Sequence, residues 1–135
     1  ARALSPRGAF ALFQHTHVAA EAESGFFSDV QPVYLEHAPE IWLDEEPPEA
    51  ETVKDASQAL LASGVFHRVD VRRYRWDETY SAERYVRILR TFSGHIALPL
   101  ERRERLFEGV ERWITERFDG HVTKGYLVIL HVAHR

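Results

Sequence analysis

The sequence predicts an α/β fold with a three-stranded mixed sheet and about five helices. Three segments rich in β-branched and aromatic residues give the strands, at residues 9–18, 66–76 and 126–134. Between them, apolar residues recur at intervals of three and four, which is typical of amphipathic helices. The last segment is apolar at consecutive positions, so a strand there would be buried on both faces. We therefore expect it to be the central strand, with a neighbour on each side.

The composition is that of a globular protein. The 135 residues are 44% hydrophobic and 28% charged, and we expect residues 1–135 to form a single domain. The formal net charge of −4 and the absence of a long apolar run argue against nucleic acid and membranes as partners, and favour a cytoplasmic protein. The sequence has no cysteine, which excludes disulfides and cysteine nucleophiles. It also has no methionine and begins with Ala1, so we expect a preceding segment to be missing.

Turn and helix signals divide the first half of the chain. A Ser-Pro-Arg-Gly turn leads into the apolar strand segment Ala9–Phe13. The next apolar positions follow helical spacing but are interrupted by Pro32 and Pro39, which indicates two short helices. Residues 51–63 are predicted to form a longer helix that ends at Gly64. Its inward side chains are expected to be Val53, Ala56, Leu60 and Leu61.

The second half contains a charged strand and two further helices. In residues 66–76, Val69 and Val71 face one way among charged side chains, which favours an edge strand; a phosphate-binding patch is the alternative. Ser81 is expected to cap one helix, and Pro99 to open the next. The inward side chains of these two helices are expected to be Tyr85, Ile88, Leu89, Phe92, Leu106, Phe107, Val110, Trp113 and Ile114.

The direction of the first strand relative to the last is left open by the residues themselves. If Ala9–Phe13 runs parallel to the last strand, the connection must be a long right-handed crossover. Two helices separate residues 66–76 from the last strand, which also permits an antiparallel arrangement. Both arrangements stay open at this point.

Several segments, taken in order, carry a resemblance to a known family. Residues 4–10 read Leu-Ser-Pro-Arg-Gly-Ala-Phe, a turn followed by an apolar strand. Residues 66–76, 80–85 and 89–93 give a strand and the helix after it, and residues 120–135 give a glycine-bearing turn and a final apolar strand. Together they resemble the carboxyl-terminal half of the class I S-adenosylmethionine-dependent methyltransferases, in the small-molecule branch that includes trans-aconitate-methyltransferase-like proteins.

The resemblance implies a partial Rossmann-like sheet in which the final strand lies antiparallel between the other two. Arg7 departs from the family pattern, which has a glycine there. The resemblance also implies a small-molecule methyl acceptor and S-adenosylmethionine as cofactor. The family holds this cofactor with a glycine-rich turn in its first half, whereas this sequence has seven glycines and no Gly-x-Gly turn. We therefore expect the cofactor-binding half to be absent from this chain, and the chain alone to be inactive.

His15 and His17 are the candidate catalytic residues. They are two residues apart, so they share a face if the strand continues, and in the resembling family the exit from this strand borders the substrate pocket. An imidazole there could act as a base for the acceptor. With Glu21 and Glu23 the two histidines could also form a metal site, or they could simply be polar residues at a strand end; we assign no metal.

Tyr34, His37 and Trp42 are the candidate residues of a substrate pocket. They lie on the short helices after the first strand, which correspond to lid helices in the family. The alternative is that this aromatic stripe belongs to the core. His131 lies inside the last strand and is expected to be a hydrogen-bonded interior histidine or one exposed on a face.

Two functions stay open. The first is the substrate-side half of a small-molecule methyltransferase, and the second is a non-catalytic interaction or dimerisation domain derived from that fold. In the family, the strand that corresponds to Ala9–Phe13 has a further neighbour, which this chain lacks. An apolar edge strand is a template for pairing, so we expect a homodimer or pairing with the missing amino-terminal half.

Overall fold

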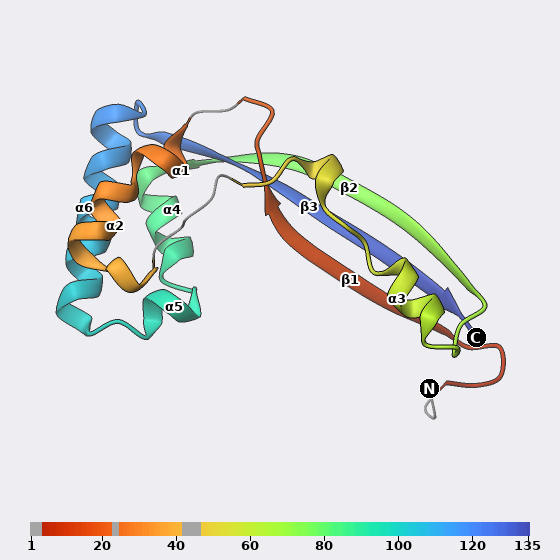
Figure 1. Cartoon of the computed structure of the whole chain (residues 1–135). Coiled ribbons are helices and arrows are strands. Elements are labelled where there is room, and N and C mark those ends of the chain that lie inside the picture. Colours follow the sequence, from red (N-terminus) through yellow and green to blue (C-terminus); the bar gives the residue numbers. More distant parts are fainter. Residues whose placement is uncertain (1–3, 23–24, 42–46) are drawn as a thin grey trace. The chain divides into compact units, whose positions relative to one another are not determined.

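The carboxyl-terminal segment forms the central strand of a three-stranded antiparallel sheet (Figure 1). The computed structural model describes residues 4–22, 25–41 and 47–135. The outer strands are β1 (Ala9–Val18) and β2 (Arg68–Ser81), and β3 (His121–His134) lies between them. The central position predicted for the last strand is confirmed, and so is the edge position predicted for the charged strand.

The mixed sheet expected from the sequence is wrong, because each neighbouring pair of strands is antiparallel. The antiparallel direction of the last strand, which the resemblance implied, is confirmed. β1 runs antiparallel to β3 over all its ten residues. At one end of β2, the amide of His67 donates to the carbonyl of His134 over 2.9 Å. At the other end, the amide of Ala82 donates to the carbonyl of Gly120 over 3.0 Å, so β2 is also antiparallel to β3. β1 and β2 therefore run in the same direction, but β3 separates them.

β2 and β3 are longer than predicted. The sequence predicts strands at residues 66–76 and 126–134, whereas both strands have fourteen residues and include polar positions outside these ranges. The additional residues of the two strands pair with each other, and the hydroxyls of Thr79 and Thr123 are 2.8 Å apart. The sequence does not signal this extension, because its polar residues lack the alternation that marks a half-buried strand.

Helices fill the two connections between the strands. Those of the described residues are the α-helices α1 (Phe26–Asp29), α2 (Gln31–His37), α3 (Ser57–Ala62), α4 (Ala82–Leu89), α5 (Ser93–Ile96) and α6 (Leu100–Arg117), with the 3-10 helices η1 (Pro39–Ile41) and η2 (Ala50–Thr52). α1 and α5 are single turns of four residues each. The remaining α-helices are close in number to the five or so that the sequence predicts. In the described part of the chain, no helix has the length and apolarity needed to cross a membrane.

The predicted helix boundaries are largely confirmed. The Ser81 hydroxyl accepts the amide of Arg84 over 3.3 Å and caps α4. Pro99 directly precedes α6, where its missing amide hydrogen is no loss. Gly64 (φ 68°) and Gly120 (φ 76°) follow helix ends in the left-handed conformation that glycine adopts without strain.

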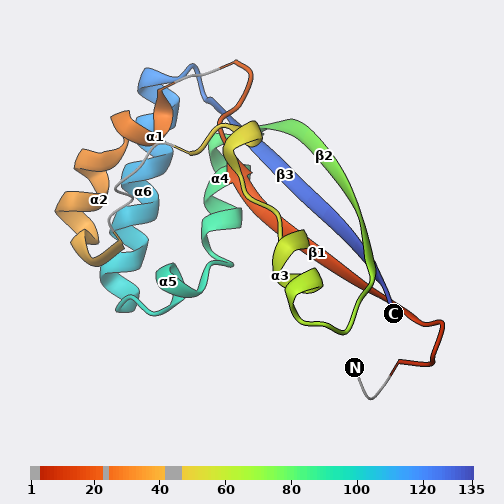
Figure 2. The ribbon, with the colours of Figure 1, turned by 45° about the vertical axis from the view of Figure 1, so that its right-hand side comes forward.

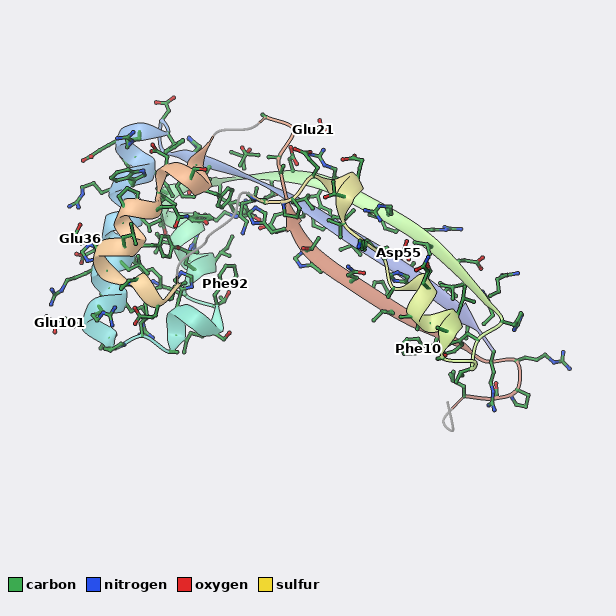
Figure 3. The ribbon with its side chains drawn as sticks, viewed as in Figure 1. Phe10, Glu21, Glu36, Asp55, Phe92 and Glu101 are labelled. Atoms are coloured by element: carbon green, nitrogen blue, oxygen red, sulfur yellow. The ribbon has the colours of Figure 1, made fainter. Side chains whose placement is uncertain are left out.

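The helix predicted at residues 51–63 is wrong in its length. It is replaced by η2, an extended segment and the short α3. The carboxylate of Asp55 (Figure 3) accepts the backbone amide of Ser57 over 2.7 Å, a local bond that competes with helix formation upstream. As a result, Leu61, expected to face inward, is exposed.

The chain divides into two compact units. The sheet unit comprises the residues up to Ala19, Pro48–Trp76 and Gly125–Arg135. The helical unit comprises Ala20–Pro47 and Asp77–Lys124. β2 and β3 therefore contribute residues to both units. The expectation of a single domain over residues 1–135 stays a prediction.

One face of the sheet unit is covered by the segment that contains η2 and α3. The buried side chains on that face are Val18, Ala50, Leu127 and Ile129, with Val53 and Val71 packed against them. Burying each large aliphatic side chain stabilises the fold by roughly 1.5–3 kcal/mol. At Gly125 the backbone of β3 lies very close to the backbone at the end of β1. A Cβ added at Gly125 would come within 2.6 Å of the carbonyl oxygens of Val18 and Ala19. Only glycine fits there, which explains the glycine before the apolar run.

His131 is a fully buried polar residue on the covered face. Its Nε2 accepts the backbone amide of Ala56 over 3.0 Å. Since Nε2 is an acceptor, Nδ1 carries the hydrogen and points to the carbonyl of Leu12, 3.4 Å away. The ring therefore joins the segment before α3 to both β1 and β3. The predicted hydrogen-bonded interior histidine is confirmed.

The helical unit is built around α6, which packs against α2 and α4 (Figures 1 and 2). The inward residues predicted for α6 are buried, except that Trp113 is half-buried and its indole donates to Asp29 over 2.9 Å. Phe26 lies edge-on to Tyr85 and Phe118, with ring centroids 5.4 and 5.3 Å away. Phe92, predicted to face inward on α4, lies beyond the end of that helix and is exposed.

Replacing His131 by leucine should destabilise the sheet unit. The substitution introduces an apolar side chain of similar size and leaves the Ala56 amide without an acceptor, a loss of roughly 1–3 kcal/mol. Urea unfolding should show this loss, and the Ala56 amide should exchange its hydrogen faster in the variant. His121→Leu, at an exposed position of the same strand, is the control and should leave both values unchanged. Equal stability of His131→Leu and the wild-type chain would contradict the anchoring role.

Candidate functional site

The two candidate catalytic histidines lie side by side in β1, and their positions share one face of the sheet as predicted. His15 is opposite Val128 and His17 is opposite Tyr126 in the register with β3. The His15 ring is exposed, and its centroid is 5.6 Å from that of Tyr126, with 27° between the planes. The His17 ring is 6.4 Å from the same tyrosine. Tyr126 thus connects the two histidines to the central strand.

Trp76 completes this group from the other edge of the sheet. Its ring lies 5.3 Å from Tyr126, with only 22° between the planes, and 6.4 Å from His15. We call His15, Trp76 and Tyr126 the aromatic cluster. Each of its three members comes from a different strand, so the cluster exists only because the three strands pair in this order.

The aromatic cluster lies on the face of the sheet that η2 and α3 do not cover, which we call the open face. Side chains alternate between faces along a strand, so Phe13 and Tyr74 share this face with His15 and Trp76. Phe13 is 68% exposed, Tyr74 47% and Trp76 43%. Large aromatic side chains gathered on an exposed surface mark an interaction site more often than isolated ones do.

Sequence reasoning found the histidines but missed Trp76 and Tyr126. Both are aromatic residues at an end of a predicted strand, which is the signal that was available. They lie next to His15 only because of the register between the strands, and this register cannot be read from any short stretch of the sequence.

The structure does not bring together a metal site from these residues. Glu21 belongs to the helical unit, where its amide donates to the Asp77 carboxylate over 2.8 Å. Glu23 lies outside the described residues. Among the residues that the structure describes, no group of three or more histidine, aspartate or glutamate side chains is arranged to hold a metal ion.

Two of the three predicted pocket residues, Tyr34 and His37, lie in the helical unit. Tyr34 is buried, and its hydroxyl is 3.1 Å from Nε2 of the buried His95. His37 is half-buried beside Gly109 of α6, and Trp42 lies outside the described residues. The side chain of Tyr34 therefore packs in the core, and the substrate pocket formed by the three residues stays a prediction.

The Tyr34–His95 pair titrates abnormally because it is buried. Loss of solvent raises the pKa of the Tyr34 hydroxyl and lowers the pKa of His95. The His95 ring also lies parallel to Phe107, with the centroids 5.9 Å apart. A neutral imidazole is the form that this apolar environment favours.

Lys124 is a second buried ionisable group that sequence reasoning missed. It is 6% exposed, and its amine lies 5.6 to 5.9 Å from the ring centroids of Phe27, Tyr85 and Phe92. Burial lowers the pKa of this amine to about 8. The sequence signal that could have found Lys124 is its spacing of two residues from the apolar Val122. In a strand this spacing places both side chains on one face of β3, and both are buried there.

A polar pocket of about 480 Å³ lies in the sheet unit beside η2 and α3. Two of its charged residues hold the chain's own backbone. Arg73 donates to the carbonyls of Ala50 and Val53, over 2.5 and 3.1 Å, and Asp55 accepts the amide of Ser57. The charged residues of the pocket therefore hold the backbone of the segment before α3 in place.

The described residues contain no glycine-rich turn of the kind that holds a nucleotide cofactor. A backbone that approaches such a cofactor closely needs a glycine-rich turn after a strand. In the described chain, β1 is followed by Ala19 and Ala20, and β2 runs directly into the Ser81 cap. No residue of this chain is therefore assigned to S-adenosylmethionine.

No family model matches the chain, and no curated protein matches it at a significant level.

Lowering the pH should destabilise the helical unit through His95. The pKa of His95 is lowered in the folded chain, so below about pH 6.5 the unfolded chain binds a proton that the folded chain does not. Stability is therefore lost as the pH falls from about 6.5 toward the folded pKa, by no more than about 1.4 kcal/mol per pH unit.

Urea unfolding at pH 7.5 and pH 5.5 measures this effect as a difference between variants. His95→Gln removes the titrating ring and should lose less stability on acidification than the wild-type chain. His121→Gln, at an exposed position, is the control and should keep the wild-type pH dependence. Identical pH dependence of His95→Gln and the wild-type chain would contradict the assignment.

Proposed function

We propose that this chain is the substrate-side half of an S-adenosylmethionine-dependent methyltransferase that acts on a small molecule. The observation that carries the proposal is the strand order β1–β3–β2, with the last strand antiparallel between two strands of equal direction. This is the arrangement expected from the resembling segments. The order of elements along the chain, with helices in both connections, also supports it.

The open face is the proposed acceptor side. Its aromatic cluster lies at the end of β1 where the strand leaves the sheet unit, as expected for the border of an acceptor pocket. S-adenosylmethionine supplies an activated methyl group when it is bound, so the protein mainly has to position the acceptor and exclude water. An acceptor hydroxyl or amine must lose a proton, and the unprotonated imidazole of His15 or His17 can accept it.

The proposal includes a division of labour between two halves. This chain contributes acceptor contacts and a proton acceptor, whereas cofactor binding requires a nucleotide-binding half that it does not contain. We therefore propose that the isolated chain has no methyltransferase activity, and that it works when joined to or paired with such a half.

Calorimetric titration with S-adenosylmethionine tests this division. The isolated chain should give no saturable heat, because no glycine-rich turn follows a strand in its described part. Joining or mixing the chain with a nucleotide-binding half that has a glycine-rich turn after a strand should restore binding of the cofactor. Micromolar binding by the isolated chain would show that the account of the missing half is wrong.

A second candidate function is a non-catalytic interaction domain, and one observation favours it. Among the described residues, β1 pairs on one side only and carries the most exposed large hydrophobic side chain, Phe13. An exposed edge with apolar side chains and no lysine or proline is open to pairing with another chain. This candidate predicts a homodimer through β1.

Analytical ultracentrifugation separates the second candidate from the first. If the interaction domain is correct, the chain should sediment as a dimer at high concentration, and Phe13→Lys should sediment as a monomer, because a charged side chain blocks edge pairing. Leu100→Lys is the matched control, since Leu100 is similarly exposed but lies in the helical unit. A monomeric wild-type chain at high concentration would exclude this candidate.

A further inference from the structure

The side chain of Lys124 ends among three aromatic rings of the helical unit. Its amine lies 5.8 Å from the ring centroid of Phe27 in α1 and 5.9 Å from that of Tyr85 in α4. The third ring is that of Phe92 (Figure 3), which follows α4 and has its centroid 5.6 Å from the amine. We call Phe27, Tyr85 and Phe92 the Lys124 cage. The amine reaches β3 from one strand and the rings come from other segments, so only the folded chain brings them together.

The Lys124 cage keeps water away from the amine. Lys124 is 6% exposed, and Tyr85 is buried as well. Aromatic rings attract an ammonium group within about 6 Å of their centroids, and all three distances are close to that limit, so this attraction is weak. The loss of water therefore outweighs it and lowers the pKa of the amine to about 8. At pH 7.5 such an amine is roughly one-quarter unprotonated, compared with roughly one in a thousand for an ordinary lysine amine.

The amine is nevertheless close to the surface. Phe92 has the ring nearest to it and is itself 40% exposed, so a single side chain separates the amine from solvent on that side. An exposed side chain changes its rotamer within nanoseconds, and the Phe92 ring can therefore move aside for a small molecule. The rings that such a molecule meets are apolar, which favours a molecule with an apolar body.

An unprotonated lysine amine in an apolar environment is a nucleophile for carbonyl carbon. In the first step the nitrogen–carbon bond forms, and a proton moves from the nitrogen to the former carbonyl oxygen. The hydroxyl group then leaves as water when the carbon–nitrogen double bond of the imine forms. The reaction needs no oxidant or reductant, and exclusion of water from the site slows the reverse hydrolysis.

We propose that Lys124 forms a covalent imine with an apolar aldehyde that enters the Lys124 cage. A charged aldehyde is disfavoured, because its charge would lose water among the rings without gaining a partner there. The proposed reaction goes beyond the methyltransferase function and does not depend on it. Lys124 belongs to the helical unit, whereas the aromatic cluster belongs to the sheet unit.

Reductive trapping on the wild-type chain tests the proposal. The sequence has two lysines, Lys54 and Lys124, and Lys54 is exposed, so each chain contains its own comparison. With benzaldehyde and sodium cyanoborohydride at pH 7.5, each imine is reduced to a stable secondary amine, and mass spectrometry of a digest measures it at each lysine. Lys124 should be labelled at least about tenfold faster than Lys54. Slower labelling of Lys124 would overturn the proposal, because a lysine that is only a buried structural cation is protected from the reagent.

A second aldehyde tests the chemistry of the cage. Glyoxylate also carries an aldehyde group, but it adds a carboxylate. The preference for Lys124 over Lys54 should be at least about fivefold smaller with glyoxylate than with benzaldehyde. An equal preference with both aldehydes would overturn the proposed selectivity for an apolar molecule.

Variants locate the reacting amine in the cage. Phe92→Ala should slow the labelling of Lys124 by benzaldehyde at pH 7.5, because water reaches the amine and favours its protonated form. Ile96→Ala is the matched control, since Ile96 is a similarly exposed apolar residue of the same unit but has no ring beside the amine. Its labelling should equal that of the wild-type chain. Unchanged labelling of Lys124 in a folded Phe92→Ala chain would overturn the role of the cage.

Discussion

The hydrogen bonding of β3 on both of its edges is the interaction on which the rest of the structure depends. Buried backbone amides and carbonyls must be paired, and a strand in the middle of a sheet satisfies this requirement along its whole length. β1 and β2 are each attached through β3, and they do not contact each other as neighbours. β2 and β3 each contribute residues to both compact units, so both units contain part of this strand pair.

The two faces of β3 have unlike surroundings. On the covered face, aliphatic side chains and the fully hydrogen-bonded His131 anchor the segment before α3. A polar ring is tolerated there because both its nitrogens have partners. On the open face, the side chains next to Tyr126 are aromatic and partly exposed. Within the sheet unit, the segment with η2 and α3 thus covers one face, and the aromatic side chains on the other face are partly exposed.

The two functions proposed for the chain depend on this same uncovered surface. A small-molecule acceptor would use the aromatic cluster, whereas a protein partner would use the backbone edge of β1 and Phe13 beside it. Neither proposal needs the polar pocket beside α3, where charged side chains already hold the backbone. Neither needs Lys124 or the Tyr34–His95 pair, which belong to the interior of the helical unit.

The sequence by itself determined the features that arise from local stereochemistry and composition. The cap at Ser81, the helix end at Gly64, the proline before α6 and the fully apolar segment of β3 all act within a few residues, so they can be recognised without a fold. The tertiary structure decided the pairing register, the polar extension of two strands and the meeting of His15, Tyr126 and Trp76. These depend on register between segments far apart in the chain, and register is set by the packing of the whole sheet, because a shift of one residue would turn every side chain to the other face.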